Sequence, residues 1–414
     1  MNFKLTKLEK SWILYDVGNS AFILMVSTII PIYFNHLAET AAISSVDFLA
    51  YWGYAMSIST LIVAFAGPLL GTFSDYQNFK KPVFAISILV GAIGCATLGL
   101  VHSWILFLIV FIVAKIGFNS SLIFYDSMLT DITTEDRMDK ISSHGFAWGY
   151  IGSCIPFILS LVLVLGADKI GLTMEAAMAI SLAMIAVWWI LASLPLLKKY
   201  HQKYYVPVQD RVIYHTFKRL FESLKNIKNE KHIFMFLLAF FFYIDGVYTI
   251  IEMATAYGKA LGFDSTQLLG ALLLTQIVAF PSAILFGRLS DKFNNTRLIT
   301  VCIIAYFFIT IFAMLMNKQI HFWILAVCVG LFQGGVQSLS RSYFAKIIPA
   351  EKSGEYFGIL DICGKGASFL GTTLIGVISQ VTGSVNKGIS VLIIIFIIGI
   401  ILFRKSVAML PKAK

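Results

Sequence analysis

Long apolar runs, each close to 20 residues and separated by short polar stretches, constrain this chain more than any other feature of its sequence. A helix needs about 20 apolar residues to cross the ~30 Å hydrocarbon layer of a bilayer, whereas a barrel strand shows about ten residues of alternating polarity. Runs of alternating polarity do not occur here, so we predict an all-α integral membrane protein. The twelve predicted spans lie near residues 12–36, 47–72, 82–101, 104–128, 144–165, 174–196, 232–257, 265–288, 297–316, 321–344, 356–380 and 387–405.

The composition excludes a soluble globular protein. Hydrophobic residues make up 58% of the chain and charged residues only 13%, against roughly half and about a quarter in soluble proteins. The net charge of +10 does not indicate nucleic-acid binding, because the basic residues lie between apolar runs rather than on one shared face. All five cysteines fall within apolar runs and lack metal or redox spacing, so we expect them to act as small hydrophobic residues.

One segment occurs twice in the chain, at an offset of 216 residues. The two copies read GTFSDYQNFKK (residues 71–81) and GRLSDKFNNTR (residues 287–297), so Asp75 corresponds to Asp291. The same offset matches Glu135 with Glu351 and Asp139 with Glu355. A constant offset over this length predicts one structural unit used twice. We therefore expect two six-helix halves, residues 1–197 and 232–414, joined by a linker at residues 198–231.

The linker carries a pattern of its own. Apolar residues recur in it at helical spacing and basic residues occupy the other faces: Ile213, Phe217, Leu220, Leu224 and Ile227 against Lys218, Arg219, Lys225 and Lys228. This pattern predicts an amphipathic helix on the inner leaflet, where anionic lipid attracts the basic side chains. A disordered basic linker is the alternative.

Lysine and arginine predict the orientation. With the N-terminus in the cytoplasm, only a few basic residues escape the inner side: Lys169, Lys259, Lys318 and Lys387 face outward, and Lys115 and Lys365 lie within spans. Cytoplasmic loops carry the excess of basic residues in membrane proteins. We therefore predict that both termini and the linker are cytoplasmic, in the cell membrane if the chain is bacterial. The first run is too long for the core of a signal peptide, so we count it as a span.

Three further segments carry a family resemblance: WILYDVGNSAF (residues 12–22), FFYIDGVYTI (residues 241–250) and SLSRSYFAKIIPAEKSGEYFG (residues 338–358). Six plus six helices, with Gly-x-x-x-Asp and basic residues after helices two and eight, resemble the major facilitator superfamily. The three segments are similar to its vacuole effluxer branch, which is related to the autophagy-linked exporter of vacuolar amino acids. Val17 and Gly18 stand where many relatives have Trp and Ala, and Asn78 and Asn294 replace the later glycine of the loop motif. The resemblance implies secondary active transport by alternating access.

The repeated loop predicts part of a gate at the cytoplasmic end. A carboxylate there can cap the positive N-terminal end of a neighbouring helix and pair with a cation. Asp75 and Asp291 are the candidates, with Arg341 and Lys81 as partners; the alternative is that both acids are ordinary solvated turn residues. Acids near the inner ends of other spans complete the set. The predicted gate residues are Asp16, Asp75, Lys81, Asp126, Asp291, Arg341 and Asp361.

Charged residues within the spans predict a substrate site. A charge at mid-bilayer costs about 2.5–3.5 kcal/mol on insertion scales, so it normally faces a partner or a wet cavity. The predicted substrate-binding residues are Asn19, Lys115, Asn119, Asp245, Tyr248, Gln333 and Lys365, and Asp245 and Glu252 are the predicted proton-coupling residues. We expect Asp245 to lie between Lys115 and Lys365, where a substrate carboxylate would offset the repulsion of the two lysines. Structural ion pairs between packed helices are the alternative.

The resemblance suggests export of amino acids or similar small zwitterions, coupled to protons. Two alternatives stay open: an exporter of amphiphiles, drugs or lipids with the same fold, and a membrane-embedded enzyme. The sequence has neither the His–Glu or His–Asp spacing of metal sites nor a Gly-rich phosphate loop. We therefore expect no metal, no cofactor and no ATP-driven pump. The expected partners are a small-molecule substrate, a proton and membrane lipid, and the expected state is a monomer.

Overall fold

The computed structural model describes residues 3–208 and 210–410, and these residues are almost entirely helical. The first group of helices is α1 (Lys7–Ser27), α2 (Ile29–Thr40), α3 (Ser45–Ser74), α4 (Lys80–Leu98), α5 (Trp104–Ser127), α6 (Leu129–Ile132), α7 (Met138–Leu165) and α8 (Met174–Lys199). After α9 (Val212–Asn226) follow α10 (Lys231–Ala260), α11 (Ser265–Leu289), α12 (Asn295–Met314), α13 (Gln319–Ile347), α14 (Ser353–Thr382), α15 (Val385–Ile389) and α16 (Val391–Ala408). Short 3-10 turns are η1 (Glu135–Arg137), η2 (Ala167–Ile170), η3 (Ile227–Asn229) and η4 (Ala350–Lys352).

Within the described residues, 11 helices are long and apolar enough to cross a membrane, and α1 with α2 forms a further, broken span. The two helices of that pair are bent by 40° at their junction, Thr28. Pro31 explains the break, because its ring has no N–H to donate and crowds the carbonyl four residues earlier. The prediction of an all-helical membrane protein with twelve spans is therefore confirmed when the bent pair is taken as one span.

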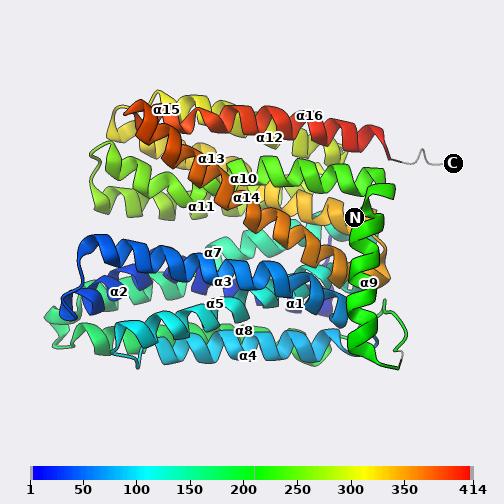
Figure 1. Cartoon of the computed structure of the whole chain (residues 1–414), viewed down its shortest axis with the longest axis horizontal. Coiled ribbons are helices and arrows are strands. Elements are labelled where there is room, and N and C mark those ends of the chain that lie inside the picture. Colours follow the sequence, from blue (N-terminus) through cyan, green and yellow to red (C-terminus); the bar gives the residue numbers. More distant parts are fainter. Residues whose placement is uncertain (1–2, 209, 411–414) are drawn as a thin grey trace.

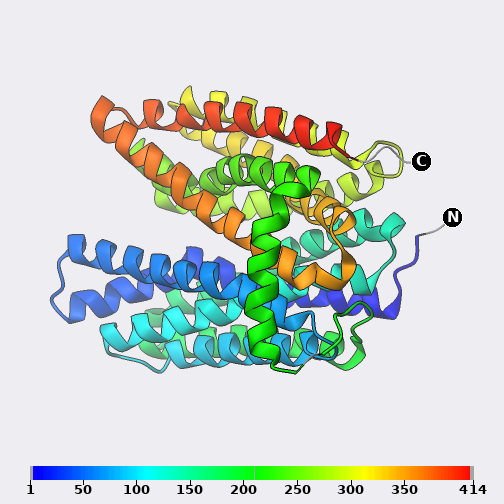
Figure 2. The same cartoon turned by 45° about the vertical axis from the view of Figure 1, so that its right-hand side comes forward.

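The helices before α9 lie in one bundle and those after it lie in another, with α9 lying crosswise over one end of both (Figures 1 and 2). Two helix pairs make the main seams between the bundles, α3 against α14 and α7 against α11. The chain enters α1 and leaves α16 at the end where α9 lies (Figure 1). The outermost residues, 1–2 and 411–414, lie outside the described part of the chain. The predicted linker helix is thus present, and the alternative of a disordered linker is wrong for residues 212–226.

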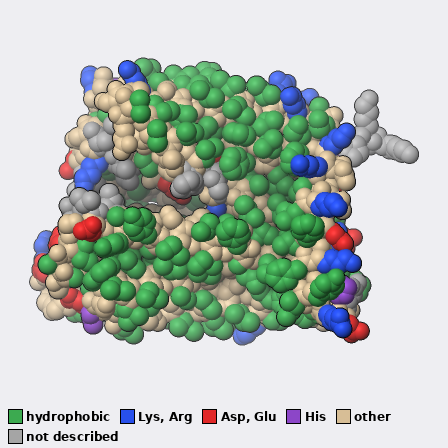
Figure 3. All heavy atoms as spheres, viewed as in Figure 1, with side chains coloured by type: hydrophobic (Ala, Val, Ile, Leu, Met, Phe, Trp, Pro, Cys, Tyr) green, Lys and Arg blue, Asp and Glu red, His purple; other side chains and the backbone are tan. Residues whose placement is uncertain are grey.

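The outer surface is apolar and the charges gather at its ends. Hydrophobic side chains cover the visible face between the ends, whereas Lys and Arg cluster beside α9 (Figure 3). Phe65, for example, is 77% exposed although it is one of the most hydrophobic residues of α3. Such a surface is stable in hydrocarbon, where helices satisfy their own backbone hydrogen bonds.

The same view shows a hollow between the two bundles at the end away from α9 (Figure 3). Near α9, in contrast, the two bundles are in close contact through the α3–α14 seam. The structure is therefore closed at the α9 end and open at the opposite end.

The internal repeat is visible in the helix boundaries. A 3-10 turn precedes both α7 and α14, and Glu135 and Glu351 lie in these two turns. The repeated loops follow α3 and α11 and lead into α4 and α12. Each copy of the loop therefore lies beside the first turn of a long helix of the other bundle.

Candidate functional site

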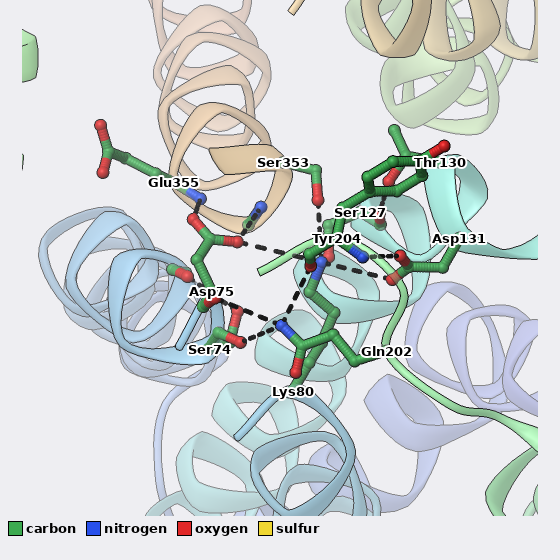
Figure 4. A network of polar contacts seen from close by, with 12 residues as sticks. Ser74, Asp75, Lys80, Ser127, Thr130, Asp131, Gln202, Tyr204, Ser353 and Glu355 are labelled. Atoms are coloured by element: carbon green, nitrogen blue, oxygen red, sulfur yellow. Dashed lines mark hydrogen bonds and ion pairs between the residues drawn. The ribbon is translucent and has the colours of Figure 1, made fainter. Parts of the chain in front are cut away.

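Asp75 lies just after α3 and caps the first turn of α14. Its side chain is fully buried. Its Oδ1 accepts a hydrogen bond from the backbone N–H of Gly354 at 2.8 Å, and its Oδ2 accepts one from Glu355 N–H at 3.0 Å (Figure 4). The carboxylate thus meets unpaired N–H groups and the positive end of the helix dipole. Asp75 makes the cap that the sequence indicated, whereas its role in gating stays a prediction.

Two glycines let the backbones of α3 and α14 touch at this point. A Cβ atom added to Gly71 would lie 2.2 Å from the carbonyl oxygen of Gly354. One added to Gly354 would lie 2.5 Å from the carbonyl oxygen of Gly71. Because both clashes are with backbone atoms, neither position can accept a side chain without separating the two helices.

Arg219 of the linker helix α9 joins acids of the two bundles. Its Nη2 lies 3.1 Å from Asp75 Oδ2, and its Nε lies 2.8 Å from Glu355 Oε2. Nη2 also donates to the carbonyl oxygen of Thr72 at 2.6 Å. Lys80 donates to Ser353 Oγ at 2.8 Å and lies 3.9 Å from Asp75. We call Asp75, Lys80, Arg219 and residues 353–355 the latch.

These cations differ from the predicted partners of Asp75. Neither Lys81 nor Arg341 forms an ion pair with Asp75 in the part of the chain that the structure describes. Helix α4 begins at Lys80, and the next residue lies about 100° further around the helix. Lys80 therefore points into the latch, and the prediction of Lys81 as the partner of Asp75 is wrong, while its role in gating stays a prediction.

Burial raises the pKa of the Asp75 carboxyl to about 7, although Lys80 and Arg219 oppose that rise. The carboxylate form has the donors it needs: two backbone N–H groups and two cations. Removing a cation would therefore leave a buried charge with little compensation.

The chain after α8 is attached to the same network. Asp131 of α6 is fully buried, lies 3.7 Å from Lys80 Nζ, and accepts hydrogen bonds from the backbone N–H groups of Lys203 and Tyr204, both at 3.0 Å (Figure 4). The N–H of Val206 donates to the carbonyl oxygen of Asp75 at 2.8 Å. The start of the linker is thus fixed to the first bundle before α9 begins.

The second copy of the loop is built differently. Asp291 is 52% exposed and pairs with Lys140 at 2.6 Å, so it does not cap a helix in the described structure and the alternative of a solvated turn residue holds for it. The neighbouring acid Asp139 is buried instead, accepting from Ser342 Oγ and pairing with Lys346 Nζ at 2.7 Å. The difference follows from the sequence, because the position equivalent to Lys80 is a threonine and offers no cation to a buried Asp291.

Arg341 of α13 is buried against the first bundle and connects three of its helices. Its Nη1 lies 2.8 Å from Asp126 Oδ1 of α5 and 4.0 Å from Asp16 Oδ2 of α1. Its Nε and Nη2 donate to the hydroxyl and carbonyl oxygens of Ser142 on α7, at 2.8 and 2.9 Å. Three of the predicted gate residues, Asp16, Asp126 and Arg341, are therefore brought together.

Aromatic rings enclose this guanidinium. Its carbon lies 4.2 Å from the ring centre of Phe146, 4.7 Å from Trp12 and 5.3 Å from Tyr125. Such cation–π contacts gain strength where water is excluded. One cation faces two acids here, and Asp16 Oδ2 has no hydrogen-bond partner among the described residues.

Lys365 and Asp361 pair with each other one turn apart on α14. Both side chains are partly exposed. The structure therefore places Asp361 beside Lys365, and it makes no ion pair with Arg341 among the described side chains.

Lys115 of α5 is largely buried, and its Nζ lies 2.8 Å from Met56 Sδ. Its ammonium forms no ion pair with an acid among the described residues. Glu252 of α10 is exposed. Lys115 is therefore a buried cation without an acid partner in the described part of the chain.

Asp245 does not lie between the two lysines, and that prediction is wrong. It is fully buried inside the second bundle, where Oδ1 accepts from Gly371 N–H at 3.0 Å and from Thr249 Oγ1 at 3.2 Å. A Cβ atom at Gly371 would lie 2.6 Å from this carboxylate oxygen, so the glycine makes the space for it. Glu252 lies two turns further along the same helix.

Three amides of the predicted site are buried with an unpaired polar atom. These are Asn19 Nδ2, Asn119 Nδ2 and Gln333 Oε1, none of which has a partner among the described residues. Gln333 also lines a cavity of about 40 Å³ between α10, α11 and α13. Tyr248 is partly buried one turn before Glu252. Buried polar atoms usually have partners, so these amides are candidates for contact with a solute.

Sequence reasoning missed Lys80, Asp131 and Ser142 as interface residues, and it assigned Arg219 to the surface of the linker helix. Among the interface residues, the sequence pointed only to Glu355 and Asp139, because these two acids are separated by the repeat offset of 216 residues. Among the described residues, no group of three or more His, Cys, Asp or Glu side chains could hold a metal ion.

Comparisons with known proteins agree with this architecture. Residues 6–410 match the family model described as "Vacuole effluxer Atg22 like". The chain is 42% identical over 404 residues to the uncharacterized MFS-type transporter YxiO of Bacillus subtilis (strain 168), which covers 96% of this chain and 94% of the relative. It is 24% identical to autophagy-related protein 22 of Saccharomyces cerevisiae (strain ATCC 204508 / S288c), over 93% of this chain and 89% of the relative.

Solved structures show the same fold. The major facilitator superfamily transporter FucP, in the outward conformation, superposes with a TM-score of 0.72 at 13% identity, over 97% of each chain. The proton:xylose symporter XylE gives a TM-score of 0.70 at 12% identity, over 98% of this chain and 94% of XylE. The predicted major facilitator fold is therefore confirmed.

Proposed function

The chain belongs to the vacuole effluxer Atg22-like family of MFS-type secondary transporters, and from this premise we propose that it carries an amino acid or a similar small zwitterion. It is an integral, multi-pass membrane protein of a transporter family, not an enzyme. The observation that carries the substrate proposal is the buried Lys115 of α5, which has no acid partner among the described residues, together with Glu252 of α10 as a candidate acid of the other bundle.

A zwitterion satisfies both of these groups at once. Its carboxylate would meet Lys115 of α5 and its ammonium would meet Glu252 of α10, so a bound solute would connect helices that belong to different bundles. Substrate sites of such transporters lie near the bilayer midplane between the repeats. The unpaired amides of Asn119 and Gln333 offer further hydrogen bonds to the solute.

We further propose the orientation and the division of the chain. Residues 1–197 and 232–414 form the two halves, 198–231 links them, and the α9 end faces the cytoplasm. The basic residues beside α9 support this, because cytoplasmic ends carry the excess of Lys and Arg (Figure 3). On this orientation the structure is closed to the cytoplasm and open to the outside.

Proton coupling is proposed through Asp245 and Glu252. Asp245 is fully buried and no cation pairs with it among the described residues. A carboxylate ionised in such a place is costly, and a bound proton removes that cost. Because Asp245 contacts α14 at Gly371, the presence of the proton would act on the packing of α10 against α14.

The test is transport by the purified chain in proteoliposomes, preceded by a thermal-shift screen of amino acids, peptides, organic anions and amphiphiles. A bound ligand raises the apparent melting temperature by mass action. For the zwitterion found, we expect Lys115→Ala and Glu252→Gln each to abolish uptake. Lys169→Ala, which removes an exposed lysine from η2, is the matched control and should leave uptake unchanged.

Stabilisation by amphiphiles alone, with uptake insensitive to Lys115→Ala, would contradict the proposal and favour an amphiphile exporter.

Proton coupling is tested in a separate experiment. Asp245→Asn should still exchange substrate across the membrane but should no longer accumulate it against a gradient when a proton gradient is imposed. Accumulation at the wild-type level in Asp245→Asn would exclude Asp245 as the proton carrier.

A further inference from the structure

The linker helix α9 has three faces rather than the two of an ordinary amphipathic helix. One face packs on the protein and contains Thr216, Arg219 and Leu220. A second face is apolar yet exposed, and Ile213 and Phe221 on it are each 70% exposed. The second face is not part of the protein core.

The third face is charged. It carries Lys218 and Lys225 with a single acid, Glu222, and all three side chains are exposed. At about 100° per residue, Lys218 and Lys225 point away from the protein contact and lie next to the apolar face. A helix that is apolar toward one side and basic toward the other matches the boundary between acyl chains and anionic headgroups.

The position of α9 places these faces at such a boundary. The helix lies crosswise over the ends of the spans and contacts α3 (Figures 1 and 2). Hydrophobic side chains cover the flank beside it, and basic side chains follow the end of the molecule (Figure 3). The apolar face therefore continues the lipid-facing surface, and the basic face meets the headgroup layer.

The protein-facing side of the same helix holds the latch. Arg219 contacts Asp75 of the first bundle and Glu355 of the second, so it can make both ion pairs only while the two bundles are in contact. When the α9 end opens, α14 moves away from α3 and at least one of these ion pairs breaks. Whatever holds α9 in place therefore also favours the closed α9 end.

We propose that anionic phospholipid is the occupant of the exposed surface of α9 and that, through Arg219, it stabilises the state closed at the α9 end. The lipid makes the charge-complementary contact with Lys218 and Lys225, and its acyl chains cover Ile213, Phe217 and Phe221. Membrane composition would then set the balance between the two states of the transporter, independently of which substrate it carries.

The experiment measures opening of the α9 end in the full-length chain, reconstituted in nanodiscs of phosphatidylcholine with or without a quarter of phosphatidylglycerol. The reporter is Ser338→Cys in a background without the native cysteines. Ser338 is fully buried and contacts Ser142 and Ser143 of the other bundle, so a thiol there is alkylated only when the bundles separate. We expect alkylation to be about tenfold slower with the anionic lipid.

Two variants decide whether α9 and Arg219 carry the effect. Lys218→Gln combined with Lys225→Gln should remove the lipid dependence, and Arg219→Gln should give fast alkylation in both lipids. The matched control, Lys292→Gln combined with Arg297→Gln, removes two exposed basic residues at the same end but away from α9, and should keep the dependence. Equal rates in the two lipids for the unmodified chain, or a dependence that survives Arg219→Gln, overturns the proposal.

A direct measurement identifies the occupant. A fluorophore on Phe221→Cys should be quenched by phospholipid that carries a nitroxide on its acyl chain, whereas one on Lys225→Cys should be quenched more strongly by a headgroup nitroxide. Absence of acyl-chain quenching at position 221 would mean that water or a protein partner covers this face, and would refute the lipid assignment. Neither the alkylation nor the quenching measurement uses a substrate. A failure of the lipid proposal can therefore be told apart from a failure of the proposed transport function.

Discussion

Asp75→Asn is the perturbation whose outcome the latch geometry defines most sharply. The substitution keeps the size of the side chain and removes its charge. Two backbone N–H groups of α14 and the guanidinium of Arg219 now donate to the carboxylate. Asparagine has one acceptor oxygen, and its NH₂ group would face one of these donors. The buried cations Lys80 and Arg219 would also lose a negative partner.

The magnitude follows from the contacts that exist only in the closed state. A hydrogen bond to a charged group contributes about 1.5–3 kcal/mol. The amide side chain of this variant forfeits at least one such bond from α14, while Lys80 stays near position 75 in either state because both belong to the first bundle. We therefore expect the closed state to lose about 2 kcal/mol relative to the open one, which is ~30-fold in their ratio.

Alkylation of Ser338→Cys reports this ratio. We expect the rate to rise about 30-fold in Asp75→Asn, with little change in the yield of folded protein. Asp291→Asn is the matched control, since it occupies the equivalent place in the repeat but forms an exposed pair with Lys140. Exposed pairs contribute about 0.2–1 kcal/mol, so its rate should change less than tenfold. Equal effects of the two substitutions would refute the assignment of the latch to the first copy of the loop.

Three further outcomes follow from the site. Gly354→Ala should prevent closure at the α9 end, because the added Cβ would meet the carbonyl of Gly71. The control is Gly376→Ala on the same helix, whose Cβ would meet nothing within 4 Å and which should behave as wild type in the alkylation assay. Arg341→Lys keeps the charge but loses the hydrogen bonds to Ser142 and the stacking, so the melting temperature should fall and uptake should slow; an unchanged melting temperature would contradict the packing argument. Gly371→Ala should destabilise the chain by about 1–3 kcal/mol through crowding at its contact with α10, measured by thermal unfolding.

The fold could be predicted from the sequence because the bilayer leaves few choices. About twenty apolar residues in a row form a spanning helix whatever their order. The repeat offset matches each helix of the first half with its equivalent in the second half. The capping by Asp75 followed from the same repeat. What the repeat could not show is that its copies had diverged, so that a threonine in place of Lys80 leaves Asp291 at the surface.

The depth of a residue within the membrane, estimated from the sequence, does not by itself predict which side chains it contacts. Lys115 and Asp245 lie at similar depth, but depth does not show toward which neighbouring helix a side chain points. The side chain of Asp245 points toward α14, where Gly371 leaves space for it and donates a hydrogen bond to it. Arg219 was read as one more basic residue of a surface helix, because periodicity cannot tell which side of a helix will meet a neighbour.

The unequal burial of the two loop copies makes their ion pairs respond differently to salt. Raising the ionic strength from 0.01 to 1 M shortens the Debye length from about 30 to about 3 Å. The exposed pair of Lys140 and Asp291 at the α7–α11 seam is then screened, while the buried contacts of Asp75 at the α3–α14 seam are shielded from the ions. In concentrated salt the ion pair of the second loop copy would therefore weaken, while the contacts of Asp75 and the buried pair of Asp139 with Lys346 would persist.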